Sequence, residues 1–222
     1  MRDKILFSWS GGKDSILALQ SIRKNKNIEI VSLLTTITAR YDRISMHGVR
    51  RELLEKQAES MGIQLEKVII STKSSNEEYE QKMKDVLVRY KKIGVTAVAF
   101  GDIFLEELRK YRETNLEKIG LKGIFPLWKQ NSCILAKRFI DLGFKAIITC
   151  VDSKQLDGKF CGRDFDSVLL SELPKSVDPC GENGEFHSFV YAGPIFRKEI
   201  AVTKGEIVIR NGQFYFCDLM PG

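Results

Sequence analysis

The chain has 222 residues, of which 43% are hydrophobic and 29% charged, enough to bury a core as one large domain or two small ones. No apolar run approaches the roughly 20 residues of a membrane span. The charges at Arg2, Asp3 and Lys4 exclude a signal-peptide pattern, so we expect a cytoplasmic protein that does not enter the membrane. The net charge of +6 fits an anionic substrate or a nucleic acid, or else a lysine-rich solvated surface.

Strand-like and helix-like patterns alternate along the chain, which predicts a doubly wound parallel α/β sheet. The expected strands are 4–8, 28–35, 67–71, 95–100 and 146–151. The expected helices are 14–25, 49–61, 76–93, 103–119, 132–142 and 164–172, the third of them opened by a capping box of Ser75 and Glu78.

The C-terminal stretch has a different pattern. From Ile200 onward, alternating residues interrupted by Lys204-Gly205 and Asn211-Gly212 predict two β-hairpins in series. We therefore expect an ATP-binding α/β domain over 1–128 and a smaller, mixed α+β substrate domain over 129–222.

The segment Ser10-Gly11-Gly12-Lys13-Asp14-Ser15 follows the first expected strand and opens the first helix. A glycine turn at a helix N-terminus offers backbone N–H groups and the positive end of the helix dipole to a phosphate. Lys13 adds a charge, and the two serines add hydroxyl donors. The standard P-loop is excluded, because Phe7 and Asp14 stand where its glycine and serine or threonine would be. The alternative is an ordinary glycine-rich turn.

Asp102 follows the strand that ends near Phe100, at the edge where the glycine loop lies. Mg²⁺ prefers one or two carboxylates together with phosphate oxygens, so Asp102 and Asp14 are candidate metal ligands. The alternative is that Asp102 caps a helix beginning near Ile103, and both roles are compatible.

Two further groups carry candidate site residues. His47 and Arg50 precede the second helix on the ligand side, unless His47 is only a buried, satisfied histidine. The segment 180–190 holds two glycines, two carboxylates and His187, a combination that suits a cationic substrate group or ammonium, with Phe186 and Phe189 as aromatic faces. Its alternative is a tight polar turn between Pro179 and a strand.

The cysteine and histidine content argues against disulfide bonds, sulfur transfer and a histidine-based metal site. The five cysteines are odd in number and form no CxxC pair, which argues against a disulfide framework, a zinc knuckle and the sulfur-transferring tRNA enzymes. With only two histidines, a histidine-based metal site is not expected.

The Ser10–Ser15 segment resembles the pyrophosphate loop of the N-type (PP-loop) ATP pyrophosphatases, whose domain is of the HUP, adenine nucleotide alpha hydrolase-like type. Together with Gly181-Glu182-Asn183-Gly184-Glu185-Phe186-His187-Ser188-Phe189-Val190 and Gly193-Pro194, it resembles the diphthine–ammonia ligase family over about 1–200. The resemblance implies a ligase that uses ATP and Mg²⁺. It adenylates the carboxylate of diphthine on elongation factor 2 for attack by ammonia, and releases AMP and pyrophosphate.

The resemblance also implies roles for residues. The residues expected to bind ATP are Ser10, Gly11, Gly12, Lys13, Asp14 and Ser15. Those expected to bind the acceptor are His47, Arg50, Gly181, Glu182, Gly184 and Glu185. Those expected to take part in catalysis are Lys13, Asp102, Glu182, Glu185 and His187.

Some motifs, such as Met46-His47-Gly48-Val49-Arg50 and Phe125-Pro126-Leu127-Trp128, look more like the bacterial branch of the family, for which a small-molecule acceptor is the alternative. Two other functions stay open at this point: a PP-loop enzyme that modifies tRNA, and a nucleotide-binding module without turnover. Whether the chain forms a homo-oligomer is also open.

Overall fold

The computed structural model describes residues 2–44, 47–71 and 75–222. Within them, five parallel strands form the main sheet, in the spatial order β4 (Leu65–Ile70), β2 (Ile28–Thr38), β1 (Asp3–Ser8), β5 (Val95–Ala99) and β6 (Lys122–Ile124). The short β3 (Arg43–Ile44) pairs antiparallel with the end of β2. The predicted parallel sheet is therefore confirmed.

Four helices cover this sheet on its two faces, namely α1 (Lys13–Arg23), α2 (Arg51–Met61), α3 (Asn76–Lys92) and α4 (Glu106–Glu117). Leu17 of α1 and Leu53 of α2 share one buried cluster, whereas Leu87 of α3 and Leu116 of α4 share another. The residues of a strand point alternately to the two faces of a sheet, so β1 contributes Phe7 to the first cluster and Leu6 to the second. The arrangement is doubly wound.

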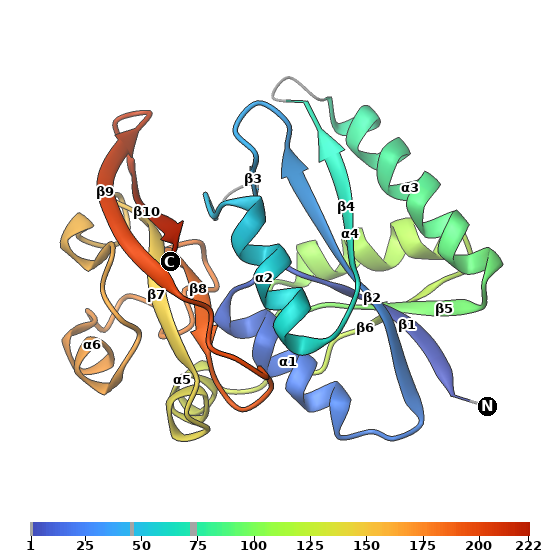
Figure 1. Cartoon of the computed structure of the whole chain (residues 1–222), viewed down its shortest axis with the longest axis horizontal. Helices are drawn as coiled ribbons and strands as arrows, with labels where there is room; N and C mark the ends of the chain where they lie inside the picture. The colour runs from blue at the N-terminus through green and yellow to red at the C-terminus, as the bar shows by residue number, and fades with distance from the viewer. Residues whose placement is uncertain (1, 45–46, 72–74) are drawn as a thin grey trace.

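A second sheet lies beside the first (Figure 1), with the strand order β8 (Phe186–Ala192), β7 (Lys145–Asp152), β10 (Phe214–Pro221) and β9 (Val202–Arg210). Its neighbours pair antiparallel, so the strand predicted at 146–151 belongs to this sheet and not to the parallel one. The remaining helices are α5 (Ser132–Asp141), α6 (Ser167–Glu172) and the short 3-10 helix Gly158–Phe160. One continuous buried cluster joins this sheet to α1 and α2.

The C-terminal hairpin corrects one prediction. Asn211 and Gly212 both have positive φ, as the expected Asn-Gly turn requires, and they join β9 to β10. The turn predicted at Lys204-Gly205 is wrong, because β9 runs straight through it. The pairing with β10 shifts register between Cys217 and Leu219 at this point, so Gly205 marks an irregularity in the ladder.

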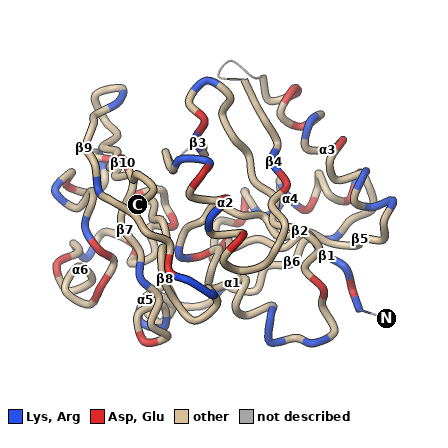
Figure 2. The backbone as a smooth tube through the Cα atoms, viewed as in Figure 1, with Lys and Arg blue, Asp and Glu red and all other residues tan. Residues whose placement is uncertain are grey.

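Smaller differences concern element ends and short strands. The helix expected to begin at 103 begins at Glu106, and β3 and β6 are too short for a periodic pattern. The cap at the start of α3 is confirmed, because the Ser75 side chain accepts a hydrogen bond from the backbone N–H of Glu78. Basic and acidic residues are interspersed along α3 (Figure 2). No helix in the described ranges is long and apolar enough to cross a membrane.

Candidate functional site

A cavity of about 1020 Å³ lies where the carboxyl ends of the parallel strands face the second sheet. Ligands of parallel α/β sheets bind at this edge. One part of its lining is apolar and comes from α3, α4 and the segment before α4, with Met83, Leu87 and Leu108. The polar part comes from the Ser10–Ser15 loop and from the second sheet. The cavity therefore joins the two halves of the chain.

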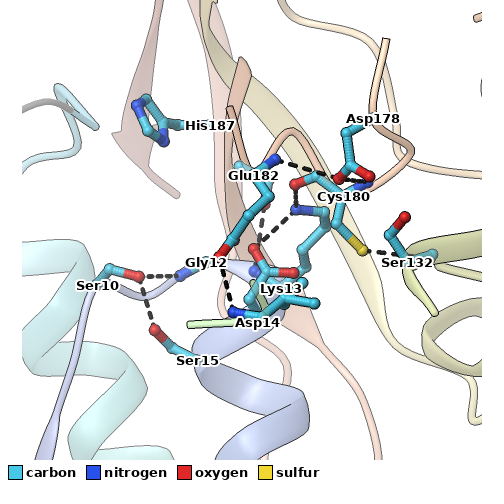
Figure 3. Close-up of polar contacts among 12 residues, drawn as sticks. Ser10, Gly12, Lys13, Asp14, Ser15, Ser132, Asp178, Cys180, Glu182 and His187 are labelled. Carbon is cyan, nitrogen blue, oxygen red and sulfur yellow. Dashed lines mark hydrogen bonds and ion pairs between the residues drawn. The ribbon is translucent and has the colours of Figure 1, made fainter. Parts of the chain in front are cut away.

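The glycine loop lies at the N-terminus of α1, where Gly12 is the N-cap and no side chain caps the helix. The Ser10 hydroxyl accepts a hydrogen bond from the Gly12 N–H at 3.3 Å and is hydrogen-bonded to the Ser15 hydroxyl at 2.7 Å (Figure 3). Gly11 has a φ of +75°, and a Cβ there would lie 2.6 Å from Leu54. Gly11 thus meets α2, whereas residues 10 and 12–15 line the cavity.

Gln57 fixes this loop to the second sheet, and sequence reasoning missed it. Its Nε2 donates to the carbonyl oxygens of Gly11 at 3.0 Å and Val190 at 2.6 Å, while its Oε1 accepts from the Trp9 indole at 3.0 Å. The Val190 N–H also donates to the Gly11 carbonyl at 2.9 Å. The sequence shows only a single glutamine on the apolar stripe of α2, and the structure buries it fully.

Lys13 does not point toward open space in the cavity. The residue is 2% exposed, and its ammonium donates to the Asp14 carboxylate at 2.8 Å and to the Cys180 carbonyl oxygen (Figure 3). It also lies over the ring of Phe186, 5.1 Å from the centroid. Burial alone would lower the pKa of Lys13, but the Asp14 carboxylate raises it, so the group stays charged. The ammonium therefore joins the two halves of the chain.

The segment 178–188 approaches the glycine loop directly, since Lys13 N–H donates to the Ser188 hydroxyl at 3.2 Å. Glu185 organises the segment: it is 2% exposed and accepts from the N–H groups of Asp178 and Asn183, both at 2.9 Å. Gly181 and Gly184 have positive φ, as the turn requires. Both oxygens of Glu185 are used within the segment, which favours a positioning role over the expected contact with substrate.

Glu182 lines the cavity and has a different environment. Its Oε1 accepts from the N–H groups of Ile103 at 2.7 Å and Phe104 at 3.3 Å, which ties the segment to the end of β5. Burial raises the pKa of Glu182 to about 7, with nearby Asp14 adding to the shift. A carboxyl with such a pKa exchanges a proton near neutral pH.

Asp102 also lines the cavity, but its partner is Arg112 of α4. Arg112 Nε lies 2.7 Å from Oδ2, and a second guanidinium N–H donates to Oδ1 at 3.2 Å. Burial raises the pKa of Asp102, and Arg112 opposes this shift. The alternative role as a helix cap is wrong, because α4 begins at Glu106 with Leu105 as its N-cap. Oδ1 of Asp14 and Oδ2 of Asp102 are both buried without a hydrogen-bond partner among the described residues, but Oδ2 of Asp102 lies in the ion pair with Arg112.

His47 and His187 lie together, whereas Arg50 lies elsewhere. The two imidazole rings are 4.4 Å apart between centroids, and both line the cavity. Arg50 instead pairs with Asp218 of β10 at 2.6 Å. The expected segment before α2 includes Ser45 and Met46, which lie outside the described residues. His47 is not a satisfied histidine, because its buried Nδ1 has no hydrogen-bond partner in the described ranges.

One other expectation needs correction, and one residue was missed. Phe189 is fully buried in the core and is not a face of the cavity, whereas Phe186 lines the cavity and lies beneath Lys13. Asp152, at the carboxyl end of β7, lines the cavity and accepts from Gln213 at 2.8 Å and Gln155 at 3.2 Å. Its signal in the sequence was the one used for Asp102, an acidic residue after a buried strand.

Known proteins match the chain over most of its length. Residues 1–123 match the family described as Diphthamide synthase N-terminal domain, and residues 131–218 match Diphthamide synthase C-terminal domain. The human protein named diphthine–ammonia ligase is 27% identical over 228 residues, covering 93% of this chain and 85% of the human protein. The Schizosaccharomyces pombe protein of the same name is 28% identical over 224 residues, covering 92% of this chain but 37% of the yeast protein.

Proposed function

The chain belongs to the diphthamide synthase family, and we propose that it is an ATP-dependent ligase that joins ammonia to a carboxylate with release of AMP and pyrophosphate. The name diphthine–ammonia ligase, carried by its relatives, supports this reaction. A tRNA-modifying enzyme or a module without turnover is not favoured, since these relatives are named as ligases.

The observation that carries the proposal is the direct contact between the Ser10–Ser15 loop and the segment 178–188 around one cavity. Forming an acyl-adenylate and then an amide requires the nucleotide, the carboxylate and ammonia in one place, with water excluded. The loop supplies the nucleotide side and Glu182 supplies the acceptor side of the same cavity.

We assign ATP to an N-type ATP pyrophosphatase domain at 1–128, with 129–222 as the acceptor domain. The phosphates lie on residues 10–15 at the N-terminus of α1, where backbone N–H groups and the helix dipole favour anions. The adenine lies near the carboxyl end of β2, where residues 34–36 line the cavity. Because Lys13 is held by Asp14 and Cys180, its role is to keep the loop against the acceptor domain.

Mg²⁺ fits Asp14 better than Asp102. The free Oδ1 of Asp14 offers one carboxylate oxygen beside the phosphate loop, and Mg²⁺ takes its other ligands from phosphates and water. Both oxygens of Asp102 are engaged by Arg112, so Asp102 would have to leave that ion pair to bind a metal. When bound, Mg²⁺ neutralises phosphate charge. Asp102 has a different role, because its ion pair holds Arg112 at the cavity wall.

The acceptor carboxylate attacks the α-phosphorus, and pyrophosphate leaves. Ammonia then attacks the acyl carbon, AMP leaves, and the proton that nitrogen loses goes to Glu182, whose pKa of about 7 suits this transfer. Glu185, Gly181 and Gly184 hold the segment in shape. The acceptor is diphthine on a protein, as on elongation factor 2; a small carboxylic acid is the alternative suggested by the bacterial-looking motifs.

Product analysis tests this function. The purified chain is incubated with ATP, Mg²⁺, ammonium and elongation factor 2 that carries diphthine. We expect AMP and pyrophosphate in amounts equal to the amide formed, and none without the acceptor. ADP and phosphate as products would overturn the proposal. If AMP forms only with a small carboxylic acid, that acid is the acceptor in place of diphthine, and the proposed ligase reaction stands.

A further inference from the structure

The His47–His187 pair brings together residues from the two halves of the chain. His47 precedes α2, His187 lies on β8, and their rings are tilted by 32° with centroids 4.4 Å apart. A Cβ on Gly12 would lie 3.4 Å from His47 Cε1, so His47 lies directly against the second glycine of the phosphate loop and His187 lies beside His47. Figure 3 shows the His187 ring apart from the Lys13–Asp14–Cys180 group.

One nitrogen of this pair has no hydrogen-bond partner in the part of the chain that the structure describes. Nδ1 of His47 is shielded from solvent and has no hydrogen bond within the described residues. A buried polar atom without a partner is costly in free energy, and it calls for an explanation. Because the atom lies beside the N-terminus of α1, an anionic ligand on that helix would supply the missing partner.

Among the described residues, the two histidines near the loop make no ion pair, although a hydrogen bond with the Ser188 backbone acts on the pKa of His47. The Lys13 ammonium is paired with Asp14, and the Arg112 guanidinium is paired with Asp102. A polyphosphate placed on the loop would therefore meet N–H groups but little unpaired positive charge. His47, beside Gly12, and its neighbour His187 can each gain a proton and supply that charge.

The free protein keeps both imidazoles neutral. Burial lowers the pKa of His187 to about 4, with Lys13 adding to the effect, and burial together with His187 holds the pKa of His47 well below 6.5. The other charged groups on this cavity are Asp14, Asp102, Arg112, Asp152, Glu182 and Arg210. Several phosphate charges beside the rings would reverse the local field and favour imidazolium.

We propose that His47 and His187 form the second half of the polyphosphate site, facing the glycine loop, and that the pair takes up a proton when the polyphosphate binds. This inference rests on the proposed function, because it requires phosphates on the Ser10–Ser15 loop. It makes ligand binding tighter at lower pH, by up to about tenfold per pH unit for each proton taken up.

The sequence makes the test direct, because these are the two histidines of the chain. Protein labelled with ¹⁵N-histidine is studied by NMR from pH 5.5 to 8, first free and then saturated with inorganic pyrophosphate. We expect the signals of neutral imidazole throughout in the free protein. At pH 7, pyrophosphate should convert at least one ring to imidazolium.

Variants and controls separate this inference from the proposed function. His47→Asn and His187→Asn keep a polar side chain without a titrating ring, and each should weaken pyrophosphate binding and remove part of its pH dependence. Glu206→Gln, on the exposed strand β9, is the matched control and should change neither. If pyrophosphate binds while both rings stay neutral, this inference alone is overturned. If it does not bind at all, the proposed ATP site is overturned with it.

Discussion

The ammonium of Lys13, at the start of α1, donates a hydrogen bond to the carbonyl oxygen of Cys180 in the loop before β8. The two residues are 167 positions apart, one at the start of helix α1 and the other in the loop before β8. A lysine that a sequence motif assigns to phosphate thus also joins the nucleotide loop to the acceptor segment. Its removal should affect folding as well as binding.

We expect Lys13→Met to lower the free energy of unfolding by about 3 kcal/mol, because it leaves the Asp14 carboxylate and the Cys180 carbonyl without their partner. Urea denaturation measures this change. The double variant Lys13→Met/Asp14→Asn should recover much of the loss, because it removes the unpaired charge. A Lys13→Met protein that loses ATP binding at unchanged stability would show instead that the ammonium serves the phosphates alone.

Gln57→Leu removes the three hydrogen bonds that join Trp9, Gly11 and Val190. We expect a loss of roughly 3 kcal/mol in stability, since these buried groups lose their partners, together with weaker ATP binding because the loop is no longer held. Lys56→Gln, its more exposed neighbour on α2, is the control and should stay within about 0.5 kcal/mol of the wild type. Equal stability of the two variants would contradict the role given to Gln57.

Glu182→Gln should leave ATP affinity nearly unchanged and reduce amide formation by about 100-fold or more, the usual size of a general-base effect. In the wild type, amide formation should rise with pH through about 7, because burial raises the pKa of Glu182 to that value and only the carboxylate accepts a proton. A pH–rate profile of both proteins checks this. An unchanged profile in the variant would remove Glu182 from the reaction.

The ion pairs of Asp218 predict a pH dependence of stability. Hydrogen bonds from Arg50 and Arg43 lower the pKa of Asp218 to about 2, against the effect of burial. A carboxyl with a lowered pKa in the folded state stabilises the protein above its unfolded pKa, and this contribution is lost as pH falls from about 4 to 2. Asp218→Asn should therefore cost roughly 2 kcal/mol at pH 7 and much less at pH 2.

Acid titrations followed by circular dichroism compare Asp218→Asn with the wild type. Asp141→Asn, at the exposed end of α5, is the control and should follow the wild-type curve. If the Asp218→Asn protein is as stable as the wild type at pH 7, the ion pairs of Asp218 with Arg43 and Arg50 do not contribute to the free energy of unfolding.

The sequence predicted those elements whose pattern repeats along the chain. The helical spacing of Tyr79, Met83 and Leu87 and the cap at Ser75 are local, so α3 lies within one residue of its expected bounds. Asn211-Gly212 forms its turn for the same reason, because the residues themselves determine the positive φ. The turn predicted at Gly205 was wrong because a glycine suits both a turn and a register shift in a strand. Only the pairing of β9 with β10 decides which of the two forms.

The candidate site could be predicted only as a set of residue types. Motifs indicated that the glycine loop and the segment 180–190 carry site residues, but whether Asp102 faces a metal or Arg112 depends on how α4 packs. The same holds for Arg50, which meets Asp218 through a contact between residues 168 positions apart. Gln57 was missed because a single polar residue in an apolar stripe has no spacing pattern to reveal it.

The most direct measurement follows an oxygen atom through the reaction. The acceptor is prepared with ¹⁸O in its carboxylate and incubated with the protein, ATP, Mg²⁺ and ammonium, and AMP is analysed by mass spectrometry. If the carboxylate is adenylated in the cavity shared by the glycine loop and Glu182, each AMP carries one ¹⁸O from the acceptor. AMP that forms together with the amide but contains no ¹⁸O would contradict the proposed reaction.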